Sequence, residues 1–148
     1  MAWTYTTLKT AIQDYLQTTE TSFVTNLPTF ITQAEERILR TVQLPDFRKN
    51  VTANFSNNDQ YLGMPSDFLS QYSMAVDSGS GYEYLLFKDA NFIREVFPDV
   101  TVTGLPKYYG IFDDSNFIIG PTPNSGYFVE LHYLYKPLSI STDPSGTS

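Results

Sequence analysis

An amphipathic helical pattern runs along the chain between residues 27 and 42. Its apolar positions recur at intervals of three and four residues, so they share one stripe of a helix. The stripe consists of Leu27, Phe30, Ile31, Ala34, Ile38 and Val42. We therefore expect a helix over 28–43, with Asn26 as its N-cap, Pro28 in its first turn and Pro45 as its stop.

Two shorter helices are expected on either side of the strand-like part of the chain. Residues 5–17 follow threonines that can cap a helix, and their apolar residues recur at helical spacing. Apolar residues also cluster over about 89–97, immediately before Pro98, which ends a helix. All the expected helices are short enough for an ordinary globular protein.

From residue 50 onward the period of the pattern changes to two, which is typical of strands. Asn57-Asn58-Asp59 predicts a turn between the first two strands, and other turn-forming residues join a second and a third pair. The expected strands cover 51–55 and 61–64, 70–76 and 82–87, 108–112 and 117–119, and 127–135, the longest. These ranges predict an α+β fold, with N-terminal helices packed on an antiparallel β-sheet or small barrel.

We expect one domain over residues 1–148, because a chain of this length suits a single modest core. Within it, 1–45 is the helical part, 46–138 is the β-rich part and 139–148 is a polar loop.

Charge excludes one large class of function. The chain has nine Lys and Arg residues against sixteen Asp and Glu residues, a formal net charge of −7. Binding to a nucleic-acid backbone depends on clustered basic side chains, and the longest basic run is Arg48-Lys49. We therefore expect no specific binding of DNA, although an acidic surface lets a polyanion pass without sticking.

Composition also limits the compartment and the chemistry. There is no cysteine, which excludes disulfides, thiolate metal sites and cysteine nucleophiles. The N-terminus lacks a signal-peptide pattern and no apolar run is long enough to span a bilayer. We expect the protein to be made and kept in a cytoplasm, without a membrane.

The only histidine, His132, is the first candidate for catalysis, because Glu130 shares its face of the expected strand and a carboxylate can orient an imidazole. No nucleophile motif accompanies the pair, so we interpret His132 as a half-exposed strand residue. Asp113-Asp114 is the candidate metal site, or with Asp99 a candidate carboxylate pair, but consecutive aspartates at a hairpin tip are usually turn formers. We predict no catalytic residue, no metal and no cofactor.

Three segments, in this order, resemble the head-to-tail adaptor (connector) proteins of tailed bacteriophages. The resemblance covers most of residues 25–140. The segments are Phe30-Ile31-Thr32-Gln33-Ala34-Glu35-Glu36-Arg37-Ile38-Leu39-Arg40 followed by Leu44-Pro45-Asp46-Phe47-Arg48, then Met64-Pro65-Ser66-Asp67-Phe68-Leu69, and then the run from Tyr108 through Pro123 to Leu138.

The resemblance implies a structural virion protein with no enzyme activity. It implies a homo-oligomeric ring, usually of twelve copies, bound between the portal protein and the tail tube, nozzle or other tail proteins, where it gives DNA a passage. The family pattern continues into C-terminal helices, so we expect 139–148 to be a truncation point in this chain.

Other functions remain as alternatives. A tail-completion, tail-terminator or baseplate protein would share this composition. A cell-wall hydrolase using Glu35 and Glu36 is disfavoured, because adjacent helix residues diverge by about 100° and cannot flank one bond. A carbohydrate-binding module would use the many tyrosines, which we instead expect in the sheet core and in subunit contacts.

Two sets of charged residues are predicted to make contacts. The polar face of helix 28–43 offers Glu35, Glu36, Arg37 and Arg40 as a subunit or portal interface. The acidic tip at Asp113 and Asp114 is expected to face the channel or a tail partner.

Overall fold

The computed structural model describes residues 3–42 and 45–142, which fall into two compact units. The helical unit combines the described residues up to 42 with those from Lys136 onward. The sheet unit is Pro45–Tyr135. The α+β class, with helices first and one large sheet after them, is confirmed. That the whole chain is a single domain stays a prediction.

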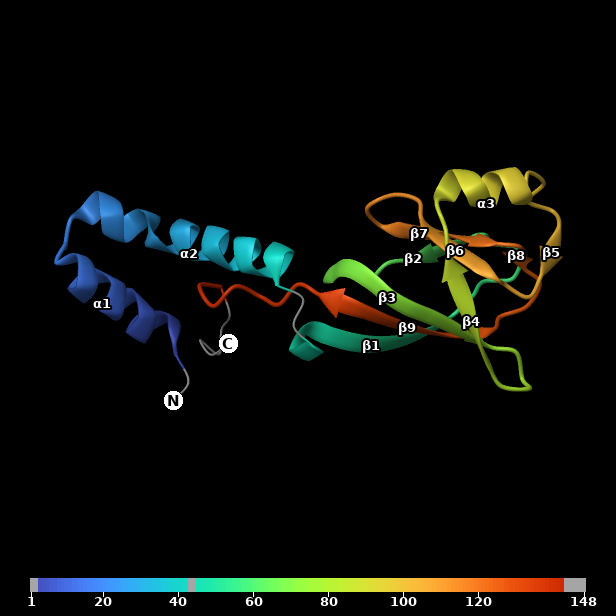
Figure 1. Ribbon diagram of the computed structural model, residues 1–148, viewed down its shortest axis with the longest axis horizontal. Helices are drawn as coiled ribbons and strands as arrows, with labels where there is room; N and C mark the ends of the chain where they lie inside the picture. The colour runs from blue at the N-terminus through green and yellow to red at the C-terminus, as the bar shows by residue number, and fades with distance from the viewer. Residues whose placement is uncertain (1–2, 43–44, 143–148) are drawn as a thin grey trace. The chain divides into compact units, whose positions relative to one another are not determined.

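The helical unit contains α1 (Tyr5–Leu16) and α2 (Thr21–Thr41) (Figure 1). Helix α1 begins as the threonines predict: Thr4 and Thr7 exchange side-chain and backbone hydrogen bonds in a capping box. Partly buried apolar side chains of α1 pack against the small core of the unit. That core consists of Leu27 and Ile31 from α2 and Ile140 from the C-terminal segment.

Helix α2 begins at Thr21 rather than at 28, so the expected start was wrong. Pro28 lies inside the helix, where it removes one backbone hydrogen bond. Asn26 does not cap, because its side-chain amide donates to the carbonyl oxygen of Ser22 over 2.9 Å. Burial of Leu27, which is 1% exposed, holds this turn in the helix despite the proline. The helix ends at Thr41, and residue 43 of the expected range lies outside the described residues.

The apolar stripe of α2 is only half buried. Leu27 and Ile31 lie in the core, but Phe30, Ile38 and Val42 are 50%, 52% and 43% exposed. The stripe therefore does not form one continuous core face. The reason is that α1 and the C-terminal segment cover the helix at Leu27 and Ile31, whereas Ile38, two turns further along the same stripe, is half exposed.

The sheet unit contains one curled seven-stranded sheet, in the order β1-β9-β3-β4-β6-β7-β2, and a two-stranded sheet of β5 and β8 (Figure 1). A 3-10 turn at Pro45–Phe47 precedes it. The strands are β1 (Arg48–Asn54), β2 (Tyr61–Gly63), β3 (Phe68–Asp77), β4 (Tyr82–Phe87), β5 (Thr103–Gly104), β6 (Tyr108–Ile111), β7 (Asn116–Gly120), β8 (Thr122–Pro123) and β9 (Phe128–Tyr135). The helix α3 (Ala90–Val96) connects β4 to the later strands.

Strand pairing agrees with the sequence in two places and departs from it in others. The hairpins β3–β4 and β6–β7 are confirmed. The expected first pair does not exist, because β1 pairs with β9 and β2 pairs with β7, so the turn at Asn58 leads the chain to the opposite edge of the sheet. The sheet is not wholly antiparallel, since β4 and β6 run parallel. The longest strand is β3, with ten residues, and not β9.

The inner face of the curled sheet holds the main core. Strand β9 contributes Val129, Leu131 and Tyr133, as its alternation predicts, and these meet Met74 of β3 and Leu85 of β4. Tyr109 of β6 and Phe117 of β7 complete this core. The curl therefore lets one sheet bury its own inner face.

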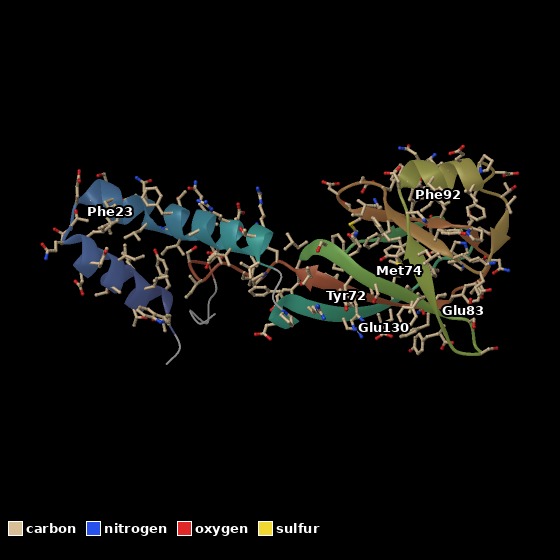
Figure 2. The ribbon with its side chains drawn as sticks, in the orientation of Figure 1. Phe23, Tyr72, Met74, Glu83, Phe92 and Glu130 are labelled. Carbon is tan, nitrogen blue, oxygen red and sulfur yellow. The ribbon has the colours of Figure 1, made fainter. Side chains whose placement is uncertain are left out.

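The outer face is covered by α3 over β6 and β7 only. Ile93 of α3 is 1% exposed, and it approaches the backbone where Gly110 and Gly120 provide no side chain. Phe92, labelled on α3 in Figure 2, packs edge-on against Tyr108. The outer side of β1, β9, β3 and β4 has no helix over it within the sheet unit.

Candidate interaction surfaces

The four charged residues predicted at one contact face of α2 do not act together. Glu35 accepts a hydrogen bond from the backbone N–H of Ile140 at 3.0 Å, and Glu36 pairs with Lys136 over 2.7 Å. Both carboxylates thus hold the C-terminal segment within the helical unit. Arg37 and Arg40 are exposed, and no ion pair of theirs occurs among the described residues.

Glu36 is paired with Lys136 and not with Arg40, although Arg40 lies four residues further along the helix. The hydrogen bond and charge of Lys136 lower the pKa of Glu36, while Arg40 contributes less. Glu35 has a second oxygen, Oε2, that is buried without a hydrogen-bond partner among the described residues. Neither glutamate therefore points toward a common site for bond cleavage.

Exposed side chains of α2 lie beside its core contacts and continue past them toward the end of the helix, and we call this surface the α2 outer face. It combines apolar side chains at four-residue spacing with two arginines. Its residues are Phe30, Gln33, Ala34, Arg37, Ile38, Arg40 and Thr41, all of them exposed. A shallow hollow on this helix is lined by Gln33, Glu36, Arg37, Arg40 and Thr41.

A second exposed surface lies on the outer side of the sheet, and we call it the outer sheet face. Its register places Tyr84 beside Ala75 and Glu130, and Tyr82 beside Asp77 and Phe128. Tyr82, Tyr84 and Leu86 of β4 are 55%, 72% and 59% exposed. The face comprises Tyr82, Tyr84, Leu86, Ser73, Ala75, Asp77, Phe128, Glu130 and His132.

Aromatic side chains thus divide between the core and the surface. Tyr109 and Tyr133 fill the sheet core, where burial raises the pKa of both phenols. Tyr72 (Figure 2) remains 57% exposed, and the guanidinium of Arg48 lies 4.3 Å from the centre of its ring. The tyrosines were expected in the sheet core and in subunit contacts, and Tyr109 and Tyr133 do lie in the core.

His132 lies on the outer sheet face between Asn50 and Ser73 and is exposed. Glu130 accepts a hydrogen bond from the side-chain amide of Asn50, not from His132. No hydrogen bond links His132 to Glu130 or Ser73 within the described part of the chain. His132 therefore is not oriented as a base that could activate the hydroxyl of Ser73, although the register places His132 and Ser73 opposite each other.

Asp113 and Asp114 lie at the exposed tip between β6 and β7. Asp113 accepts hydrogen bonds from the side-chain amide of Asn116 and the backbone N–H of Ser115, which lower its pKa and keep it charged. Asp99 is occupied separately, by Thr101. Over residues 3–42 and 45–142, no three acidic or histidine side chains gather as they would around a metal ion. The described helices also include none that is long and apolar enough to cross a membrane.

Sequence reasoning missed both apolar contact surfaces. A signal for the outer sheet face was present, because β4 reads Tyr-Glu-Tyr-Leu-Leu-Phe and carries large apolar residues on both faces. Such a strand needs cover on both sides. No comparable signal separates Phe30 and Ile38 from the buried residues of the α2 stripe, because the sequence does not show which neighbours cover the helix.

The structure is an α+β chain with exposed apolar side chains on both units. The chain matches the family model of the SU10 adaptor protein over residues 3–148, and it belongs to that family. A search of curated proteins found no significant match. The resemblance to phage head-to-tail adaptors is confirmed, and the family supports a structural adaptor role alongside other phage head and tail proteins.

Proposed function

We propose that this protein is a head-to-tail adaptor that forms a homo-oligomeric ring, of twelve copies, between the portal and the tail tube, nozzle or other tail proteins. The ring gives DNA a passage and becomes part of the virion after assembly in the host bacterial cytoplasm. The observation that carries this proposal is the match to the adaptor family along nearly the whole chain.

The distribution of charge supports a passage that does not bind DNA. The sheet unit holds eleven of the sixteen acidic residues and only five of the nine basic ones, a formal charge of −6. A wall of this sign repels a polyanion weakly at physiological salt and gives it no site to adsorb. The acidic tip at Asp113 and Asp114 faces the channel or a tail partner in this proposal.

The contacts of the ring involve α2. Of the four residues first considered, Arg37 and Arg40 are exposed and are available to a subunit or to the portal. Glu35 and Glu36 act indirectly in this interface, because they hold the segment from Lys136 to Ile140 against the helix. The work of the protein is contact, without catalysis, metal or cofactor.

Mass measurement in solution tests this proposal. The purified chain, mixed with the portal protein of the same phage, should form a complex whose mass contains the portal and a closed set of adaptor copies. Binding to a tail protein but never to the portal would contradict the proposal and favour a tail-completion, tail-terminator or baseplate protein. Hydrolysis of cell-wall material by the purified chain would contradict the non-enzymatic part.

A further inference from the structure

We infer that the outer sheet face of one copy is the docking site for the α2 outer face of a second copy. This inference rests on the proposed function, because it names the surfaces through which copies in the ring contact one another. It commits to a second copy of this chain as the occupant.

The sheet unit shows how a helix covers this side of the sheet and where none does. Helix α3 buries Ile93 against the outer side of β6 and β7. The same outer side continues over β4, β3 and β9, where Leu86 pairs in register with Tyr108 beneath α3. Tyr82, Tyr84 and Leu86 are more than half exposed there, although apolar faces of this kind are normally buried on another layer.

The composition of the outer sheet face is that of an interface core. Large aromatic side chains from β4 and β9 lie beside the small residues Ser73 and Ala75 of β3. Enrichment in aromatic residues with few charges distinguishes the centre of protein interfaces from the remaining surface. On this face the ionised groups are two acids, Asp77 and Glu130.

The α2 outer face has the matching properties. Phe30, Ala34 and Ile38 lie one turn apart along a single line, with Ala34 allowing close approach at the middle. Arg37 and Arg40 lie on one side of this line, and the two glutamates of the same helix are bonded to Lys136 and Ile140. The face is therefore apolar and basic, whereas the outer sheet face is apolar and acidic.

The opposite charges of the two faces favour the α2 outer face as the partner of the outer sheet face. Two arginines would meet the acids of a unit whose formal charge is −6, and complementary potentials favour this encounter over one between two like faces. The contact also joins two different surfaces, so it is heterologous. Repetition of a heterologous contact forms a ring when the rotation between copies closes, whereas a contact between identical patches stops at a dimer.

Cross-linking between separate chains tests the inference. Because the chain has no cysteine of its own, only the introduced cysteines can react. Two proteins are made, one with Ala34→Cys in α2 and one with Ser73→Cys in β3. They are mixed, assembled with the portal protein and treated with a short bismaleimide. We expect a covalent dimer that joins one chain of each kind. Adding Arg37→Glu and Arg40→Glu to the Ala34→Cys chain should lower the yield of this cross-linked dimer at least tenfold.

Matched controls separate this contact from general effects of charge. Lys9→Glu and Lys107→Glu together change the net charge by the same amount, on side chains outside both faces, and should leave the yield within twofold. Cross-linked dimers from either single variant alone would show a symmetric contact and overturn the inference. A double variant that cross-links within one chain would show that α2 covers its own sheet, which also overturns it.

Failure of the ring itself gives a different result. If the unmodified chain assembles with the portal but the mixed pair does not cross-link, the docking surfaces are wrong and the adaptor function stands. If the unmodified chain forms no oligomer with or without the portal, the proposed function and the docking contact both fail.

Discussion

At the scale of single residues, Asp67 of the sheet unit is a partly buried carboxylate that bonds two other side chains. Its carboxylate accepts a hydrogen bond from the hydroxyl of Tyr133 at 2.7 Å and pairs with the ammonium of Lys49 at 2.6 Å. Burial raises the pKa of Asp67, but these two hydrogen bonds outweigh it and hold the pKa below its ordinary value. The buried Tyr133 therefore depends on Asp67 for the partner of its hydroxyl.

Replacing Asp67 with Asn should destabilise the fold by about 1–3 kcal/mol, because a charged acceptor of a buried hydroxyl is lost. Tyr133→Phe should cost less when Asn already stands at 67, so a double-mutant cycle should give a positive coupling energy. The measurement is the free energy of unfolding in denaturant at neutral pH. Additive effects of the two substitutions would contradict the account.

The same carboxylate predicts a dependence on pH. A pKa lowered in the folded state gives stability that is present above the ordinary value of 3.8 and is lost as pH falls through the folded pKa. Unfolding curves should therefore show an acid-dependent loss below pH 3.8 that is smaller in Asp67→Asn, where the carboxyls of Glu36 and Asp113, whose pKa values are also lowered, remain. Asp14→Asn, a substitution of an exposed carboxyl on α1, is the control and should keep that loss.

His132 gives a prediction about chemistry. Replacing it with Ala should leave folding and particle assembly intact, because no hydrogen bond orients its ring among the described residues. Plaque formation by a phage that carries the substitution measures this. A hydrolytic activity that disappears in His132→Ala while the fold is retained would contradict a structural role.

At the scale of elements, the cover of β6 and β7 by α3 requires glycine in the strands. A Cβ at Gly120 would lie 2.7 Å from Ile93 and 2.8 Å from Phe97. Gly120→Ala should destabilise the sheet unit by about 1–3 kcal/mol, since the helix must move outward. Gly63→Ala on β2 is the control, because nothing lies within 4 Å of its Cβ position and the unfolding free energy should barely change.

The elements also show what the sequence predicts and what it leaves open. The hairpins β3–β4 and β6–β7 join strands that are neighbours along the chain, so the turn residues between them were sufficient signals. The pairing of β1 with β9 joins distant segments, and no local turn encodes it. The start of α2 was missed because Pro28 suits a first turn and only tertiary burial of Leu27 shows otherwise.

The candidate interaction surfaces also include residues that the sequence predicts correctly and residues that it does not. Arg37 and Arg40 were predicted to be exposed because charged residues on a helix point to solvent. The same reasoning included Glu35 and Glu36, yet these bind the segment at Lys136–Ile140, which lies about a hundred residues later in the chain. The outer sheet face was missed, because alternation shows that β4 is apolar on both sides but not that one side lacks a helix.

At the scale of the whole molecule, the charge of the chain predicts its behaviour toward DNA. The purified protein should cause no shift of duplex DNA in a gel at about 0.15 M salt, because its few basic residues form no stripe. A basic protein of similar size should shift the same DNA and serves as the control. Binding in the micromolar range with a steep dependence on salt would instead indicate a protein that grips DNA.

The assignment as a head-to-tail adaptor is tested most directly by locating the chain in the intact particle. The measurement is a cryo-electron microscopy reconstruction of the head–tail junction of the phage that encodes it. We expect a closed ring of this chain between the portal and the first tail protein, with the tip at Asp113 and Asp114 toward the channel or the tail. A junction without this chain, or its presence only at the distal end of the tail, would contradict the account.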